Sequence, residues 1–329
     1  MVRKDHRGWL ACIVRGSCAL APDKAEGSLS AKKKRQKIRE NPSVLFVQAR
    51  NVRCAMTEKL GPQRHLIYTV VTGGYDVINR VRWRPVNVDF VAFVDNSYRR
   101  HVPPPWTVVQ ITQENNPRDH NRRLKMVPGF AVEQYETVTY IDGNLQIIGS
   151  LDCYFEAILR ENKAFGVFQH FQRRNPFEEI DECVGRGKMS AGQGAFEIDR
   201  ISKRVANPGS LQLFDGSISI RNVANPGSRR FGLRWSELYG ECPGRDQISL
   251  SLVVQENAQE VKVFDHWRNQ QRPAIIRVPH RRGSSLLVWL VFEVGKRFPT
   301  LLVTSQQVWQ SFNTRRRKRE LENERPSAG

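Results

Sequence analysis

One stretch decides how the rest of the sequence is interpreted: Val138-Thr139-Tyr140-Ile141-Asp142-Gly143-Asn144. β-branched and aromatic residues lead up to Asp142 and predict a strand that ends there. Ligands of open α/β sheets bind outside the carboxyl ends of the strands, and a carboxylate with an amide oxygen suits a hard divalent cation. Aspartate, glycine and asparagine also favour tight turns, so a simple turn is the competing interpretation.

Strand and helix patterns alternate on both sides of this stretch. Where strands alternate with helices, the sheet is mostly parallel and the helices flank it, as in Rossmann-type α/β folds. The sequence therefore predicts a single α/β domain of this kind. β-branched and apolar runs predict strands at residues 65–72, 88–94, 106–111 and 165–168, and polar or amphipathic segments predict helices at 118–125 and 151–160.

The second half of the chain is less regular. A strand is predicted at 217–221 and a helix near 235–239. Another helix begins near Asp246, whose side chain is placed to cap the first turn. The sequence Val-Ala-Asn-Pro-Gly-Ser occurs at 205–210 and again at 223–228. Because Asn-Pro-Gly forms turns, both copies are expected to be loops.

The chain is strongly basic. Its 329 residues contain 52 Lys and Arg against 33 Asp and Glu, which gives a net charge of +19 and an isoelectric point near 10.1. Much of the excess lies in two runs, at 32–37 and 315–319, which we expect to be solvated ends. Such a charge favours polyanionic partners, whether nucleic acid, an anionic membrane surface or phosphorylated small molecules, and does not choose among them.

The cysteines and the apolar runs indicate the cellular compartment to expect for the protein. The six cysteines include no Cys-x-x-Cys pair, so we expect reduced thiols in the cytoplasm rather than a disulfide framework or a zinc site. The apolar runs at 9–14 and 286–292 are too short to span a bilayer. A buried strand or helix is expected at 286–292, and a basic segment at the inner face of a membrane is the alternative.

Sequence composition and pattern divide the chain into three parts. Residues 1–62 are basic and expected to be poorly structured, with one short strand at 44–47. Residues 63–265 carry the alternating pattern of the α/β domain, and residues 266–329 form a basic C-terminal extension.

Small polar clusters follow predicted strands or begin predicted helices. Gly73 and Gly74 directly follow the first strand, where backbone amides can approach a phosphate, although the sequence is neither a Rossmann fingerprint nor a Walker loop. Asp76 and Asp95 follow different strands at the same edge, where they can meet a ribose or base, or serve as caps. The triplet Arg245-Asp246-Gln247 offers a guanidinium, a carboxylate and an amide that can form hydrogen bonds with sugar hydroxyls.

Charged residues further along complete the candidate set. Arg122 and Lys125 share a helix face and can grip a diphosphate, unless that face is simply solvated. His170 can be a metal ligand, a base or a core histidine. Glu178 and Glu179 are candidates for acid and base chemistry or for ion pairs.

Six motifs occur along the chain in a definite order: Tyr68-Thr69-x-x-Thr72-Gly73-Gly74-Tyr75-Asp76, Asp89-Phe90-Val91-Ala92-Phe93-Val94-Asp95, Arg122-x-x-Lys125, Tyr140-Ile141-Asp142-Gly143-Asn144, His170-x-x-Arg173-x-x-x-Phe177-Glu178-Glu179-x-x-x-Cys183, and Trp235 followed by Arg245-Asp246-Gln247-Ile248-Ser249. In this order they resemble a glycosyltransferase-like family. Its plant members are linked to mucilage polysaccharide synthesis, and its bacterial members often occur with capsule or surface-polysaccharide genes. The resemblance covers about residues 65–255 and leaves both tails outside.

The resemblance implies a GT-A-like fold that transfers a sugar from a nucleotide-sugar donor to a saccharide or lipid-linked acceptor. It also implies Mn²⁺ or Mg²⁺ bridging the donor diphosphate, where GT-A enzymes carry an Asp-x-Asp sequence. The implied metal ligands are Asp142, Asn144 and His170. The implied catalytic residues are Glu178, Glu179 and Asp246. The implied nucleotide-sugar-binding residues are Thr72, Gly73, Gly74, Tyr75, Asp76, Asp95, Arg122, Lys125, Arg173, Arg245 and Gln247.

Two departures from the family pattern leave alternatives open. Asn144 replaces a second aspartate, which weakens metal affinity and leaves a metal-poor mechanism open. Phe177 stands where family members often have tyrosine, which leaves the acceptor open. Two other functions remain: a polyanion- or nucleic-acid-binding protein, although no nucleic-acid-binding motif is present, and a metal-dependent hydrolase or inactive relative on the same fold.

Overall fold

The computed structural model of the chain describes residues 64–83, 85–130, 132–270 and 273–278. The strand expected at 44–47, the apolar run at 286–292 and both basic runs lie outside these residues. Within the described ranges, no helix has the length and apolar character needed to cross a membrane. The three cysteines in these ranges, Cys153, Cys183 and Cys242, are free thiols.

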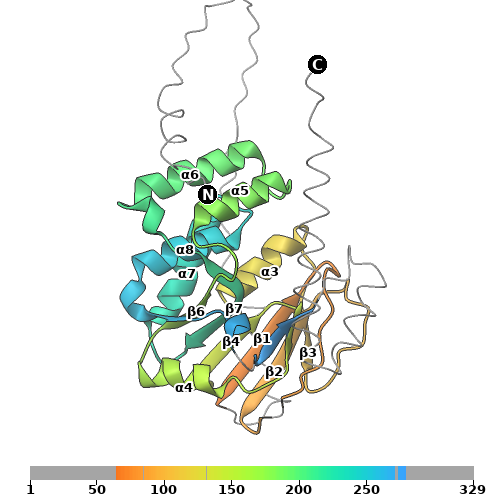
Figure 1. The fold of residues 1–329 in the computed structure, drawn as a ribbon. Helices are drawn as coiled ribbons and strands as arrows, with labels where there is room; N and C mark the ends of the chain where they lie inside the picture. Colours follow the sequence, from red (N-terminus) through yellow and green to blue (C-terminus); the bar gives the residue numbers. More distant parts are fainter. Residues whose placement is uncertain (1–63, 84, 131, 271–272, 279–329) are drawn as a thin grey trace, which may run out of the picture. The chain divides into compact units, whose positions relative to one another are not determined.

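The centre of the fold is a seven-stranded sheet in the order β3-β2-β1-β4-β7-β6-β8 (Figure 1). Six of these strands are parallel and β7 runs against them. Helices flank the sheet, so the predicted α/β fold with a mostly parallel sheet is confirmed. The strands of this sheet are β1 (His65–Val71), β2 (Val88–Val94), β3 (Thr107–Gln110), β4 (Thr137–Ile141), β6 (Phe165–Gln169), β7 (Phe214–Asn222) and β8 (Val261–Phe264). A second, two-stranded sheet pairs β5 (Leu145–Ile147) with β9 (Ile275–Arg277).

Three of the described α-helices begin after residues whose side chains accept hydrogen bonds from amides of the first turn. Asn116 accepts a hydrogen bond from the amide of Asp119 at the start of α3, and Ser190 and Gln193 form a reciprocal capping box at the start of α6. The helices are α3 (Pro117–Met126), α4 (Asp152–Arg160), α5 (Pro176–Gly185), α6 (Ala191–Arg204), α7 (Gly227–Glu241) and α8 (Asp246–Glu256), with short 3₁₀ helices η1 (Pro208–Ser210), η2 (Ala258–Glu260) and η3 (Trp267–Asn269).

Two expectations about the second half were wrong. The second Asn-Pro-Gly copy leads into α7 instead of a plain loop, because the Asn225 side chain accepts the amide hydrogen bond of Gly227 at 2.9 Å. Asp246 does not cap α8 with its side chain: the helix starts at this residue without a side-chain cap. Its carboxylate instead binds Lys125 and Arg122, two cations of α3.

The sheet is buried on both faces. Successive side chains of a strand point to opposite faces, and in β1 this alternation sends Ile67 and Val71 to one core and Tyr68 and Val70 to the other. The first core is closed by α4 and by the β5 and β9 pair, and the second by α3. Beyond β4 the second face continues into a core formed with α5, α7 and α8. All seven residues of β1 are buried, as its β-branched run predicts.

The strand order reverses between β1 and β4. From β1 the chain moves outward to β2 and β3, and it then returns to β4 on the other side of β1. At such a reversal, open α/β sheets bind ligands in a crevice outside the carboxyl ends of the strands. Because β7 is antiparallel, it brings its first residues, instead of its last, to this carboxyl edge.

The last described strand belongs to the fold. The short helix η3 and the strand β9 lie within the residues expected to form the basic C-terminal extension. Leu145 of β5 pairs with Arg277 of β9, and the amide of Val278 donates a hydrogen bond to the carbonyl of Asn144 at 2.7 Å. The C-terminal segment is therefore packed directly after the Asp142 turn.

We expect Gly232→Ala to lower the free energy of unfolding by about 1–3 kcal/mol. Gly232 is buried in α7, and a Cβ there would overlap the carbonyl oxygen of Met126 at the end of α3. Gly240→Ala in the same helix is the matched control, since nothing lies within 4 Å of its Cβ position. It should be neutral or stabilise by up to about 1 kcal/mol. Urea denaturation measures both, and equal effects would contradict close packing of α7 on α3.

Candidate functional site

The loop after β1 has a backbone that only glycine adopts easily. Gly73 and Gly74 have φ angles of 63° and 61°. The amide of Gly73 donates to the carboxylate of Asp95 at 2.8 Å, and the same carboxylate accepts the amide of Ser97 at 3.0 Å. Asp95 is fully buried, so it joins the loops after β1 and β2 from inside. Thr72 donates to the carbonyl of Pro117 at 2.6 Å and ties the loop to α3.

The Asp142 stretch forms a turn and leaves its carboxylate partly exposed. The amide of Leu145 donates to the carbonyl of Asp142 at 2.9 Å, which closes a tight turn. The Asp142 side chain is 35% exposed and accepts a hydrogen bond from the hydroxyl of Tyr140 at 2.9 Å. A Cβ on Gly143 would lie 3.1 Å from Cβ of Asp76. The residues that follow β1 and β4 therefore meet at the crevice where the strand order reverses.

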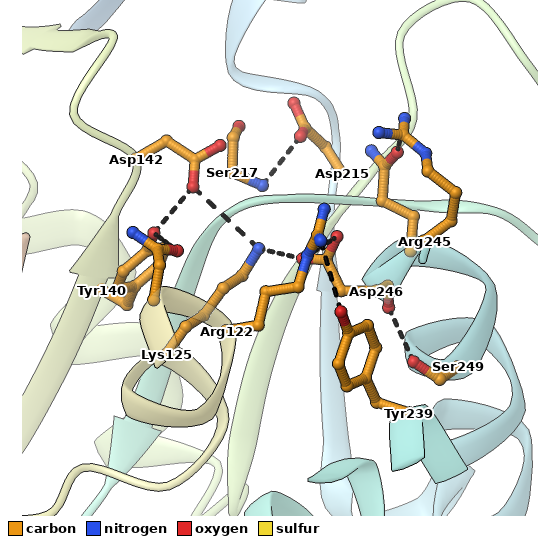
Figure 2. Close-up of polar contacts among 12 residues, drawn as sticks. Arg122, Lys125, Tyr140, Asp142, Asp215, Ser217, Tyr239, Arg245, Asp246 and Ser249 are labelled. Carbon is orange, nitrogen blue, oxygen red and sulfur yellow. Dashed lines mark hydrogen bonds and ion pairs between the residues drawn. The ribbon is translucent and has the colours of Figure 1, made fainter. Parts of the chain in front are cut away.

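A buried carboxylate organises the cations beside this turn. Figure 2 shows Asp246 between Lys125, which it hydrogen bonds, and Arg122, whose Nε lies 3.2 Å away. Burial alone would raise the pKa of Asp246, but these two cations hold it well below its usual value. Asp246 therefore stays ionised at neutral pH and has no proton to donate. Arg122 also donates to the hydroxyl of Tyr239 at 3.3 Å.

Lys125 links this carboxylate to Asp142. Its side chain is only 4% exposed, and Nζ lies 4.0 Å from Oδ1 of Asp142 and 5.3 Å from the centre of the Tyr140 ring. Burial and the nearby Asp246 raise the pKa of Asp142, while Lys125 opposes the shift. The backbone of β7 closes over the group, because a Cβ at Gly216 would lie 3.1 Å from Nζ of Lys125.

A second ion-pair group surrounds Glu179 on α5. Glu179 is fully buried and pairs with Arg245 and with Arg173, whose Nε is 2.5 Å from the carboxylate. Burial acts to raise the pKa of Glu179, but Arg245 and Arg173 keep it below its usual value. Arg245 also donates to the side-chain oxygen of Gln247 at 3.0 Å. Glu178 is exposed and accepts the amide of Arg174, so it stands apart from this group.

Eight of the predicted residues form two groups at the carboxyl edge, one around Asp246 and one around Glu179. Arg245 belongs to the Glu179 group and directly precedes Asp246, so the two groups adjoin. The carboxylates of both groups, Glu179 and Asp246, form ion pairs with arginine and lysine side chains of the same chain. Asp142 differs from both because it remains partly exposed.

His170 and the Asp142 turn provide only part of a metal site. Nδ1 of His170 accepts the amides of Gln172 at 3.2 Å and Arg173 at 3.0 Å, and Nη2 of Arg173 lies 3.2 Å from Nε2. In this conformation neither ring nitrogen points to an open position. The part of the chain that the structure describes holds no group of three or more His, Cys, Asp or Glu side chains arranged for a metal. Asp142 and Asn144 suit a cation such as Mg²⁺ that takes most ligands from phosphates and water.

Four residues of the edge were missed by sequence reasoning. Asp215, at the start of β7, accepts the amide of Ser217 at 2.9 Å and lies 3.1 Å from Nε2 of His266 and 3.4 Å from Nη2 of Arg277. Arg277 also donates to the hydroxyl of Ser217 at 3.1 Å. The carbonyl of Ser217 accepts the amide of Asp142 at 2.7 Å, so this group adjoins the crevice. Asp215-Gly216, which repeats the Asp-Gly of the Asp142 turn, is the signal that could have revealed it.

Replacing Lys125 by methionine should reduce the free energy of unfolding by about 3 kcal/mol, because it leaves Asp246 buried with one cation fewer. Lys203→Met removes an exposed lysine that pairs with Asp199 on α6, and should cost less than about 1 kcal/mol. Chemical denaturation of both variants tests the difference. If the two losses are the same, Lys125 is not a buried partner of Asp246.

His170 should make the protein more stable as pH rises from about 4 to 6.5. Burial, with help from Arg173, lowers the pKa of His170 from 6.5 to about 4. Within this window the unfolded chain binds a proton at His170 and the folded chain does not. The contribution of His170 to the free energy of unfolding is therefore complete above pH 6.5 and is lost as pH falls. The unfolding free energy of His170→Gln should therefore rise less steeply over this window than that of the wild type. Parallel curves for the two proteins would contradict a buried, neutral imidazole.

Comparisons with known proteins give similarity in structure only. No family model matches the sequence, and no curated protein sequence matches it. Mouse xyloside xylosyltransferase 1 is 12% identical over 62% of this chain and 85% of that chain, with a TM-score of 0.36. The bifunctional glycosyltransferase WbbM is 12% identical over 62% of this chain, with a TM-score of 0.37, and GlyE of Streptococcus pneumoniae TIGR4 is 9% identical over 64%, with a TM-score of 0.34. The matched regions span 39% of WbbM and 47% of GlyE.

Proposed function

We propose that the protein is a glycosyltransferase that moves a sugar from a nucleotide-sugar donor to a saccharide or lipid-linked acceptor during surface polysaccharide synthesis. One observation carries the proposal: the loop after β1 and the Asp142 turn after β4 meet where the strand order reverses, with Lys125 and Arg122 beside them. The ordered motifs that resemble a glycosyltransferase-like family with plant and bacterial members support it further.

The residues of the crevice suit the parts of a nucleotide sugar. Tyr75 follows the Gly73-Gly74 turn, and its ring is 53% exposed, so it can contact a base or ribose. Asp76 lies against Gly143, and its carboxylate can accept hydrogen bonds from ribose hydroxyls. Sugar transfer releases a nucleoside diphosphate, whose growing negative charge needs fixed positive groups nearby. Arg122 and Lys125 would supply that charge from α3.

The cofactor in this proposal is Mn²⁺ or Mg²⁺ at the Asp142 turn. Asp142 and Asn144 would provide the protein ligands, and a bound cation would neutralise the leaving diphosphate. Tyr140 orients the Asp142 carboxylate through its hydroxyl, and Lys125 favours the ionised form of the same carboxylate. We place the reaction in the cytoplasm, with the basic tails near the inner face of an anionic membrane.

The test is a thermal-shift titration with UDP and with GDP, each with Mn²⁺. The wild type should gain several degrees in Tm with one of them, since ligand at 100 times Kd stabilises by about 2.7 kcal/mol. Asp142→Ala should lose the gain. Asp199→Ala, which removes an exposed carboxylate on α6, should keep it.

Equal shifts in wild type and Asp142→Ala would remove Asp142 from the site. Transfer is then assayed with nucleotide sugars and oligosaccharide acceptors. Release of free sugar without any acceptor would favour a hydrolase. Salt-sensitive oligonucleotide binding without a nucleotide response would favour a nucleic-acid-binding protein.

A further inference from the structure

Arg268, just after β8, is a partly buried cation that lies among aromatic rings. Its guanidinium carbon is 5.3 Å from the centre of the Phe171 ring and 5.0 Å from that of Trp267. Within residues 64–83, 85–130, 132–270 and 273–278, its buried Nε has no hydrogen-bond partner and no carboxylate forms an ion pair with it. A guanidinium in this state has hydrogen-bond donors to offer a planar anion.

A second arginine increases the positive charge at this place. Burial and the neighbouring Arg277 lower the pKa of Arg268 to about 10, and Asp215 only partly opposes the shift. Asp215 already accepts bonds from Ser217 and Arg277 and contacts His266. Arg268 therefore shares Asp215 with Ser217, His266 and Arg277, while Arg277 also acts on Asp142.

An exposed aromatic ring borders these arginines. Phe171 follows β6, and 41% of its surface is exposed although one side contacts Arg268 and the His266 ring, 5.2 Å away. The C–H faces of pyranose rings pack on aromatic rings in the same way as other apolar groups, while their substituents reach polar side chains at the rim. A phenyl ring beside a guanidinium thus suits a sugar ring that carries an anion.

This surface lies at the same edge as the crevice but beyond β7. Asp142 follows β4, whereas Phe171 and Arg268 follow β6 and β8, the next strands past β7 in the sheet. The Asp142 amide bonds the carbonyl of Ser217, and Arg277 bonds the hydroxyl of the same serine. A donor between β1 and β4 would therefore have Phe171, Arg268 and Arg277 on the side toward β8.

We infer that Phe171, Arg268 and Arg277 bind the acceptor, and that the acceptor is a saccharide bearing a carboxylate. The inference rests on the proposed glycosyl transfer and names the acceptor class for it. Phe171 holds a pyranose ring, and the two arginines bind its carboxylate. The net charge of +19 agrees with a polyanionic acceptor, because it draws such a chain toward the protein.

The experiment compares two probes that differ only in the carboxylates: a set of uronate oligosaccharides, and the same set after reduction of the carboxyl groups to alcohols. Affinities are measured by calorimetry on the full chain near physiological salt. Arg268→Gln should weaken binding of the acidic set about tenfold and leave the reduced set unchanged. Phe171→Ala should weaken both sets.

Arg230→Gln is the matched control, since it removes an exposed arginine of α7 that pairs with Glu260 and leaves the tails intact. Equal affinities in Arg268→Gln and Arg230→Gln, or no measurable binding by the wild type, would overturn the inference. The nucleotide thermal shift should survive in Arg268→Gln. Its loss would assign Arg268 to the donor phosphates instead, and would also overturn the acceptor site. Acidic saccharide binding without any nucleotide shift would refute glycosyl transfer alone.

Discussion

The buried charge of Asp246 constrains the whole carboxyl edge. A carboxylate removed from water must be paired, and its partners here come from α3, far upstream in the chain. The same residue accepts the indole N–H of Trp235 through its carbonyl at 3.0 Å, so it also fixes α7 against α8. The strand β7 passes over the Lys125 and Asp246 ion pair at Gly216, because any side chain at this position would crowd Lys125. The helices α3, α7 and α8 and the strand β7 are thus all positioned around the buried Asp246 carboxylate. The Asp142 carboxylate lies beside this group, 4.0 Å from Nζ of Lys125.

The sequence predicted those parts of the fold in which local pattern and burial agree. Strands β1, β2 and β4 are buried on both faces, so their continuous apolar runs identify them without knowledge of the partner strands. The helix α3 was predicted at 118–125 from a polar, basic segment, and the structure begins it at Pro117, after the capping residue Asn116. The strands β8 and β9 are short and mixed in burial, so nothing local distinguishes them from loops.

The candidate site was predictable as a set of residues and less so as a set of contacts. The residues after β1 and β4 meet because parallel strands end at one edge, which is a rule of topology. The ion pairs follow no such rule. Asp246 occupies a position that commonly caps a helix, and only the tertiary fold turns its carboxylate to Lys125. Asp215 was missed because its role depends on β7 being antiparallel, which a sequence pattern does not reveal.

The pairing of β5 with β9 has a consequence for the order in which the molecule is completed. A chain emerges from the ribosome from its N-terminus, and contacts between residues far apart must wait for the later one. The loop after β1, the helix α3 and the Asp142 turn are all made before Arg277 is synthesised. The edge beyond β7 therefore acquires its last cation only when nearly all of the described chain has left the ribosome. A nascent chain stopped short of β9 would contain the residues of the Asp142 turn and lack both Arg277 and the strand that pairs with β5.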